Sequence, residues 1–158
     1  MNIVSILLWG FAATVALTTV LFAGQAFGLT RIDMPFIVGT MFTLHRDRAR
    51  VIGFAVHIVN GWLFAFVYAL FFENLHLATW WLGATLGFLQ GTVVVLVVLP
   101  LLPGVHPRMV SDFRGPEPTR LLEPPGYLAM NYGRLTPLIT LVAHTFYGTI
   151  IGALYLLK

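Results

Sequence analysis

Four long stretches of apolar residues dominate this sequence, at about residues 3–28, 51–72, 80–101 and 136–157. Each is long enough to cross the hydrocarbon core of a bilayer as a helix, which takes about 20 residues. Strands of a membrane barrel would instead alternate apolar and polar residues over about 10 positions. The pattern predicts an all-α integral membrane protein, a four-helix bundle that forms one domain over residues 1–158.

Composition supports this class and excludes a soluble fold. Of the 158 residues 58% are hydrophobic and only 9% are charged, whereas an average soluble domain has about 25% charged residues. The chain has no cysteine, which excludes disulfides and thiolate metal sites.

The segments between the stretches give further predictions. Asp33 suits a helix N-cap and Pro35 a first turn, so we expect a short interfacial helix over residues 34–43. Prolines from Pro100 onward predict that the third helix ends by about residue 101. Seven of the nine prolines lie between positions 103 and 137, which predicts an extended loop over residues 102–135.

The basic residues predict the orientation. Eight arginines flank the first and third connections, and Lys158 lies at the other side. By the positive-inside rule both arginine-rich loops are cytoplasmic, and both termini lie outside. We therefore interpret the basic pI of 9.7 as topology and expect no nucleic-acid partner. Cytoplasmic Arg46, Arg48 and Arg50 can also bind anionic lipid or an acidic partner, although topology alone explains them.

One residue pattern occurs twice with identical spacing. His57, Gly61, Ala65 and Tyr68 in the second stretch match His144, Gly148, Gly152 and Tyr155 in the fourth. The first and third stretches share small residues four apart, namely Gly10, Thr14 and Thr18 against Gly83, Gly87 and Gly91. The match indicates two duplicated helical hairpins, related as a parallel repeat about an axis along the membrane normal.

Small residues four apart lie on one face of a helix and allow two backbones to approach. This predicts helix packing at six glycines: Gly61, Gly83, Gly87, Gly91, Gly148 and Gly152.

The two matched histidines are the candidate site. An ionisable residue inside a membrane span is costly unless it faces inward and has a partner. One interpretation is structural hydrogen bonding to polar groups of the bundle interior, such as Asn60, Gln90 and Tyr147. A second is axial ligation of haem b or a chlorophyll-type pigment by His57 and His144, since neutral imidazole is a good metal ligand. A third is a proton or ion pathway.

The remaining residues show no catalytic constellation. His45, His76 and His106 lie in loops or at span ends, where we expect solvated imidazoles. The acidic residues all lie outside the spans, and no metal-ligand spacing, nucleophile elbow or phosphate-binding loop occurs. We therefore expect neither a metal site nor an enzyme.

At His57-x-x-x-Gly61 and again at Ala143–Gly148, the chain resembles small bacterial four-span membrane proteins with a repeated His-xxx-Gly signature. The resemblance covers nearly the whole chain and implies a bacterial inner membrane. It implies no catalytic residue, since that group has no established activity.

The sequence as a whole favours a non-enzymatic structural or accessory subunit of a larger membrane complex, with membrane lipid and membrane proteins or further copies of itself as partners. The alternatives are a carrier of haem or pigment for electron or energy transfer, and a small transporter.

Overall fold

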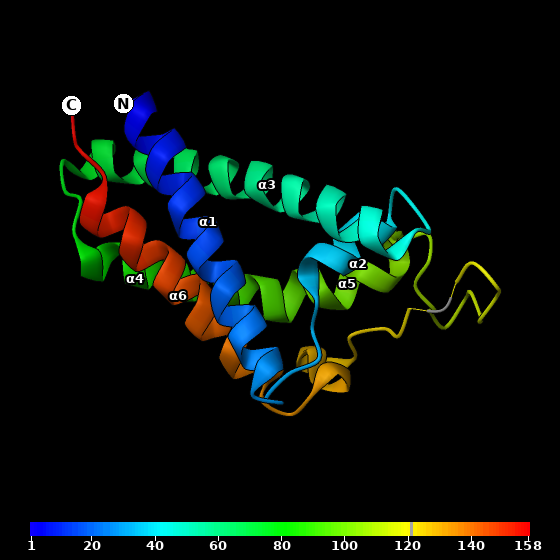
Figure 1. Cartoon of the computed structure of the whole chain (residues 1–158). Coiled ribbons are helices and arrows are strands. Elements are labelled where there is room, and N and C mark those ends of the chain that lie inside the picture. Colours follow the sequence, from blue (N-terminus) through cyan, green and yellow to red (C-terminus); the bar gives the residue numbers. More distant parts are fainter. Residues whose placement is uncertain (121) are drawn as a thin grey trace.

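The computed structural model describes residues 1–120 and 122–158, and within them the regular elements are helical, with no β-strand. The elements are α1 (Ile3–Ala26), α2 (Met34–Thr40), α3 (Arg46–Leu75), α4 (Trp80–Val93), the π-helical turn η1 (Val94–Val98), α5 (Leu99–Val105), the 3-10 turn η2 (Tyr127–Tyr132) and α6 (Thr136–Leu154), as Figure 1 shows. The all-α prediction is confirmed.

Four of these segments are long and apolar enough to span a membrane: α1, α3, α6 and the continuous segment Trp80–Val105. The last comprises α4, η1 and α5, and we refer to it as the α4–α5 rod. Four such helices are what a multi-pass membrane protein has, as the sequence predicted.

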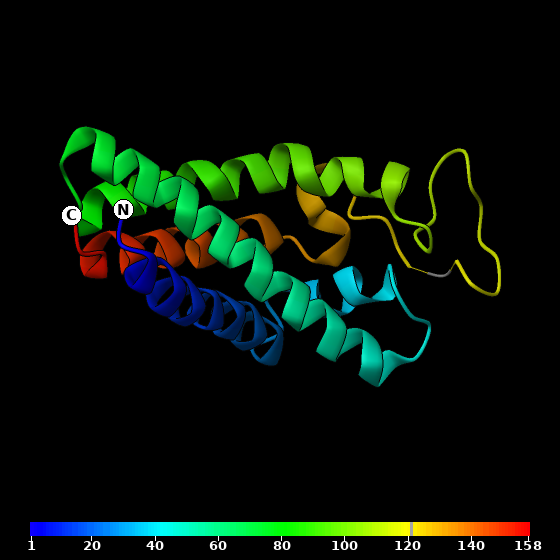
Figure 2. The same ribbon diagram turned by 90° about the horizontal axis from the view of Figure 1, so that it is seen from above.

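The four spanning helices form an arc. α1 and α6 pack against each other in its middle, α3 packs on α1, and α4 packs on α6. α3 and the α4–α5 rod are joined by the short loop of residues 76–79, and Figure 2 shows that they diverge from that loop. The two termini lie at the end of the bundle that holds this loop, and α2 lies at the opposite end.

Two predicted boundaries are wrong. α3 begins at Arg46, so the basic segment before residue 51 is helical, because it holds good helix formers and no breaker. The α4–α5 rod continues past Pro100 and Pro103 to Val105. Pro100 lies in the first turn of α5, directly after the π-helical turn η1, whose wider spacing accommodates it. The predicted loop therefore begins later than residue 102.

The smaller predicted elements differ little from the structure. α2 begins after Asp33, whose carboxylate accepts a hydrogen bond from the backbone N–H of Phe36 at 3.0 Å. α1 ends at Ala26 and α6 at Leu154, each slightly earlier than predicted. After α1 the chain turns at Gly28, which has a φ of 70° that favours glycine.

Equivalent positions of the two predicted hairpins make equivalent contacts. Thr14 of α1 faces Gly61 of α3, and the matching Gly87 of α4 faces Gly148 of α6. One turn away the same holds for the pairs Gly10–Ala65 and Gly83–Gly152. All six glycines predicted to pack are buried at such helix contacts, and the contacts follow the predicted repeat.

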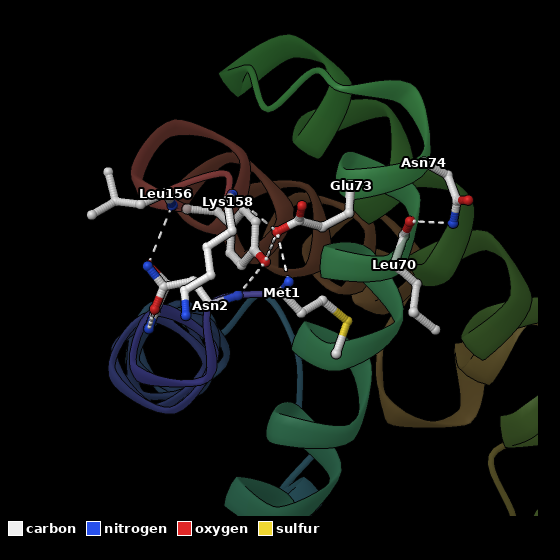
Figure 3. Close-up of polar contacts among 9 residues, drawn as sticks. Met1, Asn2, Leu70, Glu73, Asn74, Leu156 and Lys158 are labelled. Carbon is white, nitrogen blue, oxygen red and sulfur yellow. Dashed lines mark hydrogen bonds and ion pairs between the residues drawn. The ribbon is translucent and has the colours of Figure 1, made fainter.

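The end of the bundle that holds the termini is tied together by one carboxylate. Figure 3 shows Glu73 of α3 reaching toward both ends of the chain. Its Oε1 accepts a hydrogen bond from the Tyr155 hydroxyl at 2.7 Å and lies 3.4 Å from the amino group of Met1. The Tyr155 hydroxyl in turn accepts one from the backbone N–H of Asn2 at 3.0 Å. These bonds link the end of α3 to the ends of α1 and α6.

Candidate functional site

A cavity of about 190 Å³ inside the arc gathers the polar residues of the spans. Its polar lining consists of Thr14, His57, Asn60, Gln90, Thr140, His144 and Tyr147. Both candidate histidines and all three predicted polar interior residues are among them. The rest of the wall is apolar, and every spanning helix contributes to it.

His144 is held in one orientation on α6. Its side chain is 7% exposed, and its ring Nδ1 lies 2.8 Å from the carbonyl oxygen of Thr140. A ring nitrogen next to a carbonyl must carry the proton, so Nδ1 donates and the Nε2 of the neutral ring has a free lone pair. The neighbouring Gly91 leaves room for this side chain, because a Cβ there would lie 3.0 Å from the Cβ of His144.

His57 is the less constrained of the two. Its Nε2 is buried and has no hydrogen-bond partner within the described residues. A buried polar atom without a partner costs about 1–3 kcal/mol, and native structures contain few of them. Within the described residues the Oγ1 of Thr140 is likewise buried without a partner, so these two are the polar atoms of the cavity whose state requires an explanation.

Tyr147 and Gln90 have partners of their own. The hydroxyl of Tyr147 donates to the carbonyl oxygen of Gly61 at 2.6 Å, which links α6 to α3. The hydroxyl of Tyr68 donates to Oε1 of Gln90 at 2.7 Å, which leaves the amide N–H groups of Gln90 as donors. Asn60 lines the cavity from α3 and is exposed.

The cavity is covered at the α2 end and open at its side. Met34 and Val38 of α2 cover it there, together with Ile32 just before α2. Phe64 of α3 and Val98 of the α4–α5 rod also line it, yet they are 38% and 45% exposed. The part of the cavity wall that reaches the surface is therefore formed by α3 and the rod, which diverge from their connecting loop (Figure 2).

These dimensions decide which groups fit. A cavity of about 150 Å³ holds a benzene ring, so the 190 Å³ found here suits one substituted ring. A haem or chlorophyll macrocycle joins four pyrrole-type rings and is several times larger, so it does not fit between the helices as they stand. Within the described residues no group of three or more histidine and acidic side chains gathers as a metal site.

One histidine expected to be solvated is buried instead. His106 is 0% exposed, and its Nε2 donates to the carbonyl oxygen of Ile37 at 2.9 Å. Its Nδ1 accepts from the backbone N–H of Arg108 at 3.1 Å. Burial lowers the pKa of His106; the hydrogen bond to Ile37 opposes this shift, and the charge of Arg108 adds to it. The ring thus fastens the segment after α5 to α2, a long-range contact that no local sequence pattern signals.

The loop also buries a tyrosine. Tyr132 donates from its hydroxyl to the carbonyl oxygen of Glu123 at 2.6 Å. Burial, and then the charge of Glu123, raise the pKa of Tyr132 to about 12. The proline-rich loop is therefore packed against the bundle in this part.

The three predicted basic residues do not act as one surface. Arg46 and Arg50 point to the ring of Phe36 on α2, with their guanidinium carbons 5.5 and 5.7 Å from its centre. Arg48 lies on another face of α3, beside Val51 and Ile52.

Comparison with known proteins adds no relative: no family model matches the chain, and neither a curated protein nor a solved structure shows significant similarity to it.

Proposed function

We propose that this protein binds a lipophilic molecule from the membrane, with the polar head of that molecule in the cavity and its tail between α3 and the α4–α5 rod. The observation that carries the proposal is the partnerless Nε2 of His57 inside a cavity that opens sideways. A polar ligand atom at this position would supply the missing hydrogen bond.

The polar lining indicates the chemistry of the head. Gln90 offers amide donors, His144 offers a lone pair, and His57 can donate or accept according to its tautomer. A ring with carbonyl or hydroxyl oxygens, as in quinones and phenolic lipids, matches these groups. The volume of about 190 Å³ suits one such ring.

The apolar exit of the cavity indicates that the ligand has a long apolar tail. Apolar side chains line the way out of the cavity on both sides, including Phe64, Val98 and Leu102. Because lipid surrounds the bundle at this opening, a long apolar chain can leave the site without crossing a polar surface. Ligand sites are typically apolar clefts with a few placed polar groups, as here.

Mild-detergent purification followed by lipid extraction and mass spectrometry tests the proposal. We expect the protein to retain a molecule of this class, and a benzoquinone with a decyl tail to raise its melting temperature. His57→Leu should abolish both effects because it removes the polar atom but keeps an apolar side chain. His45→Gln, an exposed histidine at the N-cap of α3, is the matched control.

Equal retention and equal stabilisation in the wild type and in His57→Leu would contradict the proposal. A Soret or pigment band in the purified protein would instead support the tetrapyrrole carrier, and would require α3 to move away from the rod.

A structural or accessory subunit is the second candidate. The spanning windows of α3 and of Trp80–Val105 are only 28% and 22% buried, against 39% for α1 and for α6. Two helices so little covered by their own chain favour a partner helix beside them. Co-purification of a stoichiometric membrane protein would support this candidate, and a stable, partner-free monomer would contradict it.

We further propose a bacterial inner membrane with both termini outside the cytoplasm. The arginine-rich connections support this orientation, because positive charge collects on the cytoplasmic side. The chain lacks cysteine, so Asn74→Cys and Asp112→Cys can be labelled singly in intact cells. Labelling of position 112, and not of position 74, by an impermeant reagent would overturn the orientation.

A further inference from the structure

We propose that Arg31, Arg46 and Arg50, grouped around Phe36, form a binding site for the phosphate of an anionic lipid. This phosphate site is separate from the His57 cavity, and it does not depend on what that cavity binds.

Close packing of α2 on α3 builds the site. A Cβ atom at Gly39 would overlap the carbonyl oxygen of Ala49, and one at Gly53 would overlap that of Pro35. The backbones of the two helices therefore touch, which brings Phe36 under the arginines of the first turns of α3. The position of Phe36 is fixed by backbone contact and does not depend on the arginines.

The two α3 arginines are one turn apart and meet at the same ring. Their guanidinium carbons lie 5.5 and 5.7 Å from the centre of Phe36. Like charges spaced four residues apart on a helix destabilise each other, although the ring face attracts both. An anion between them would remove the repulsion.

The charges of the site leave an excess for such an anion. Arg50 pairs with Asp33 at 3.2 Å and Arg31 with Glu123 at 3.4 Å, both as partly exposed pairs. Arg46 has no carboxylate within 4.0 Å in the part of the chain that the structure describes. Three arginines against two carboxylates give a net charge of +1. Guanidinium groups bind phosphate oxygens in pairs.

The surroundings favour a lipid over a soluble anion. The five charged residues line a pocket of about 320 Å³, which is room for a phosphate group. Arg50 also borders an apolar surface depression formed by Phe22, Pro35, Val51 and Phe54. A lipid can therefore place its phosphate on the arginines and an acyl chain along this apolar surface.

The site can be tested in nanodiscs of phosphatidylcholine with and without phosphatidylglycerol, by thermal stability and by native mass spectrometry of the lipids that stay bound. We expect phosphatidylglycerol to stabilise the wild type, and Arg46→Gln/Arg50→Gln to weaken its retention roughly tenfold, as the loss of charge-assisted hydrogen bonds predicts. Arg48→Gln is the matched control, since Arg48 lies on another face of the same turn.

Four further results separate the explanations. The variant Arg46→Lys/Arg50→Lys retains the charge, so partial retention of phosphatidylglycerol by it would support paired guanidinium binding. Competition by inorganic phosphate at equal potency would overturn the lipid as the source. Equal loss of phosphatidylglycerol in Arg48→Gln and in the double glutamine variant would overturn the site, whereas His57→Leu should leave retention unchanged.

Discussion

The two hairpins of this bundle share one sequence pattern, yet they pack at different distances. In α4 and α6 the backbones touch, since a Cβ at Gly148 would overlap the carbonyl oxygen of Gly83. In α1 and α3 a side chain intervenes, since a Cβ at Gly61 would meet the hydroxyl oxygen of Thr14. The same repeat therefore yields one tight seam and one looser seam.

This difference explains the different states of the matched histidines. On the tight seam, His144 is buried and bonded to the carbonyl oxygen of Thr140. Beside the looser seam, α3 diverges from the α4–α5 rod, and His57 is left with a buried nitrogen that has no partner. In the proposed ligand site His144 is therefore a residue held in one orientation, whereas His57 has a buried nitrogen left for the ligand.

Breaking the tight seam should have the largest effect. We expect Gly148→Val to lower the free energy of unfolding by about 3 kcal/mol or more, since overpacking against backbone cannot be relieved by a rotamer change. Gly61→Ala should cost less, and Thr14→Ala should partly rescue it by removing the overlapping hydroxyl. Gly104→Ala is the control, with nothing within 4 Å of its Cβ. Melting curves in detergent measure the stability of all four variants. Equal loss of stability in Gly148→Val and Gly104→Ala would contradict the close backbone packing of α4 and α6.

Replacing the two matched histidines should have the next largest effects on stability, and the two effects should have opposite signs. His144→Ala should destabilise the protein by about 2 kcal/mol, since it removes a buried side chain and leaves a cavity. His57→Leu should stabilise the ligand-free protein by about 1 kcal/mol, because it removes a buried atom without a partner. If both changes lower the melting temperature of the ligand-free protein equally, the Nε2 of His57 does not destabilise that protein, and the contrast between the two histidines is wrong.

His106 links the two hairpins, because it follows α5 and binds α2. Its folded pKa lies below the ordinary value of 6.5, so the unfolded chain takes up the proton first. The stability that depends on its neutral ring is complete above pH 6.5 and is lost as the pH falls from there toward the folded pKa. We expect melting temperatures below pH 6.5 to fall less in His106→Asn than in the wild type. His45→Gln should keep the wild-type slope.

The matched tyrosines should give the smallest effect. Tyr155→Phe removes hydrogen bonds to Glu73 and from Asn2, while Tyr68→Phe removes one bond and leaves the Oε1 of Gln90 without its donor. We expect Tyr68→Phe to cost about 1 kcal/mol, the usual value for one hydrogen bond, and Tyr155→Phe, which loses two partly buried bonds, to cost roughly 1–2 kcal/mol. In addition, Tyr68→Phe should change ligand affinity through Gln90, whereas Tyr155→Phe should not. If Tyr68→Phe and Tyr155→Phe bind the ligand with equal affinity, Gln90 does not take part in the site.

Most of the fold could be predicted from local pattern. Continuous apolar runs give the four spans, Asp33 and Pro35 give the start of α2, and equal spacing gives the repeat that the contacts follow. The end of the third helix could not be predicted, because the π-helical turn before Pro100 has no signature in a run of valines and leucines. The sequence could predict that His57 and His144 lie in one site, because they match in the repeat. It could not predict that the Nε2 of His57 lacks a partner.

The sequence by itself therefore determined four membrane-length helices, since no other structure satisfies the backbone of such apolar runs in lipid. Only the tertiary structure decided that one seam is tight and the other is loose, because that depends on which atoms meet across two helices. The same holds for the burial of His106 and for the arginines on Phe36. Each results from contacts between residues far apart in the chain, which local composition does not encode.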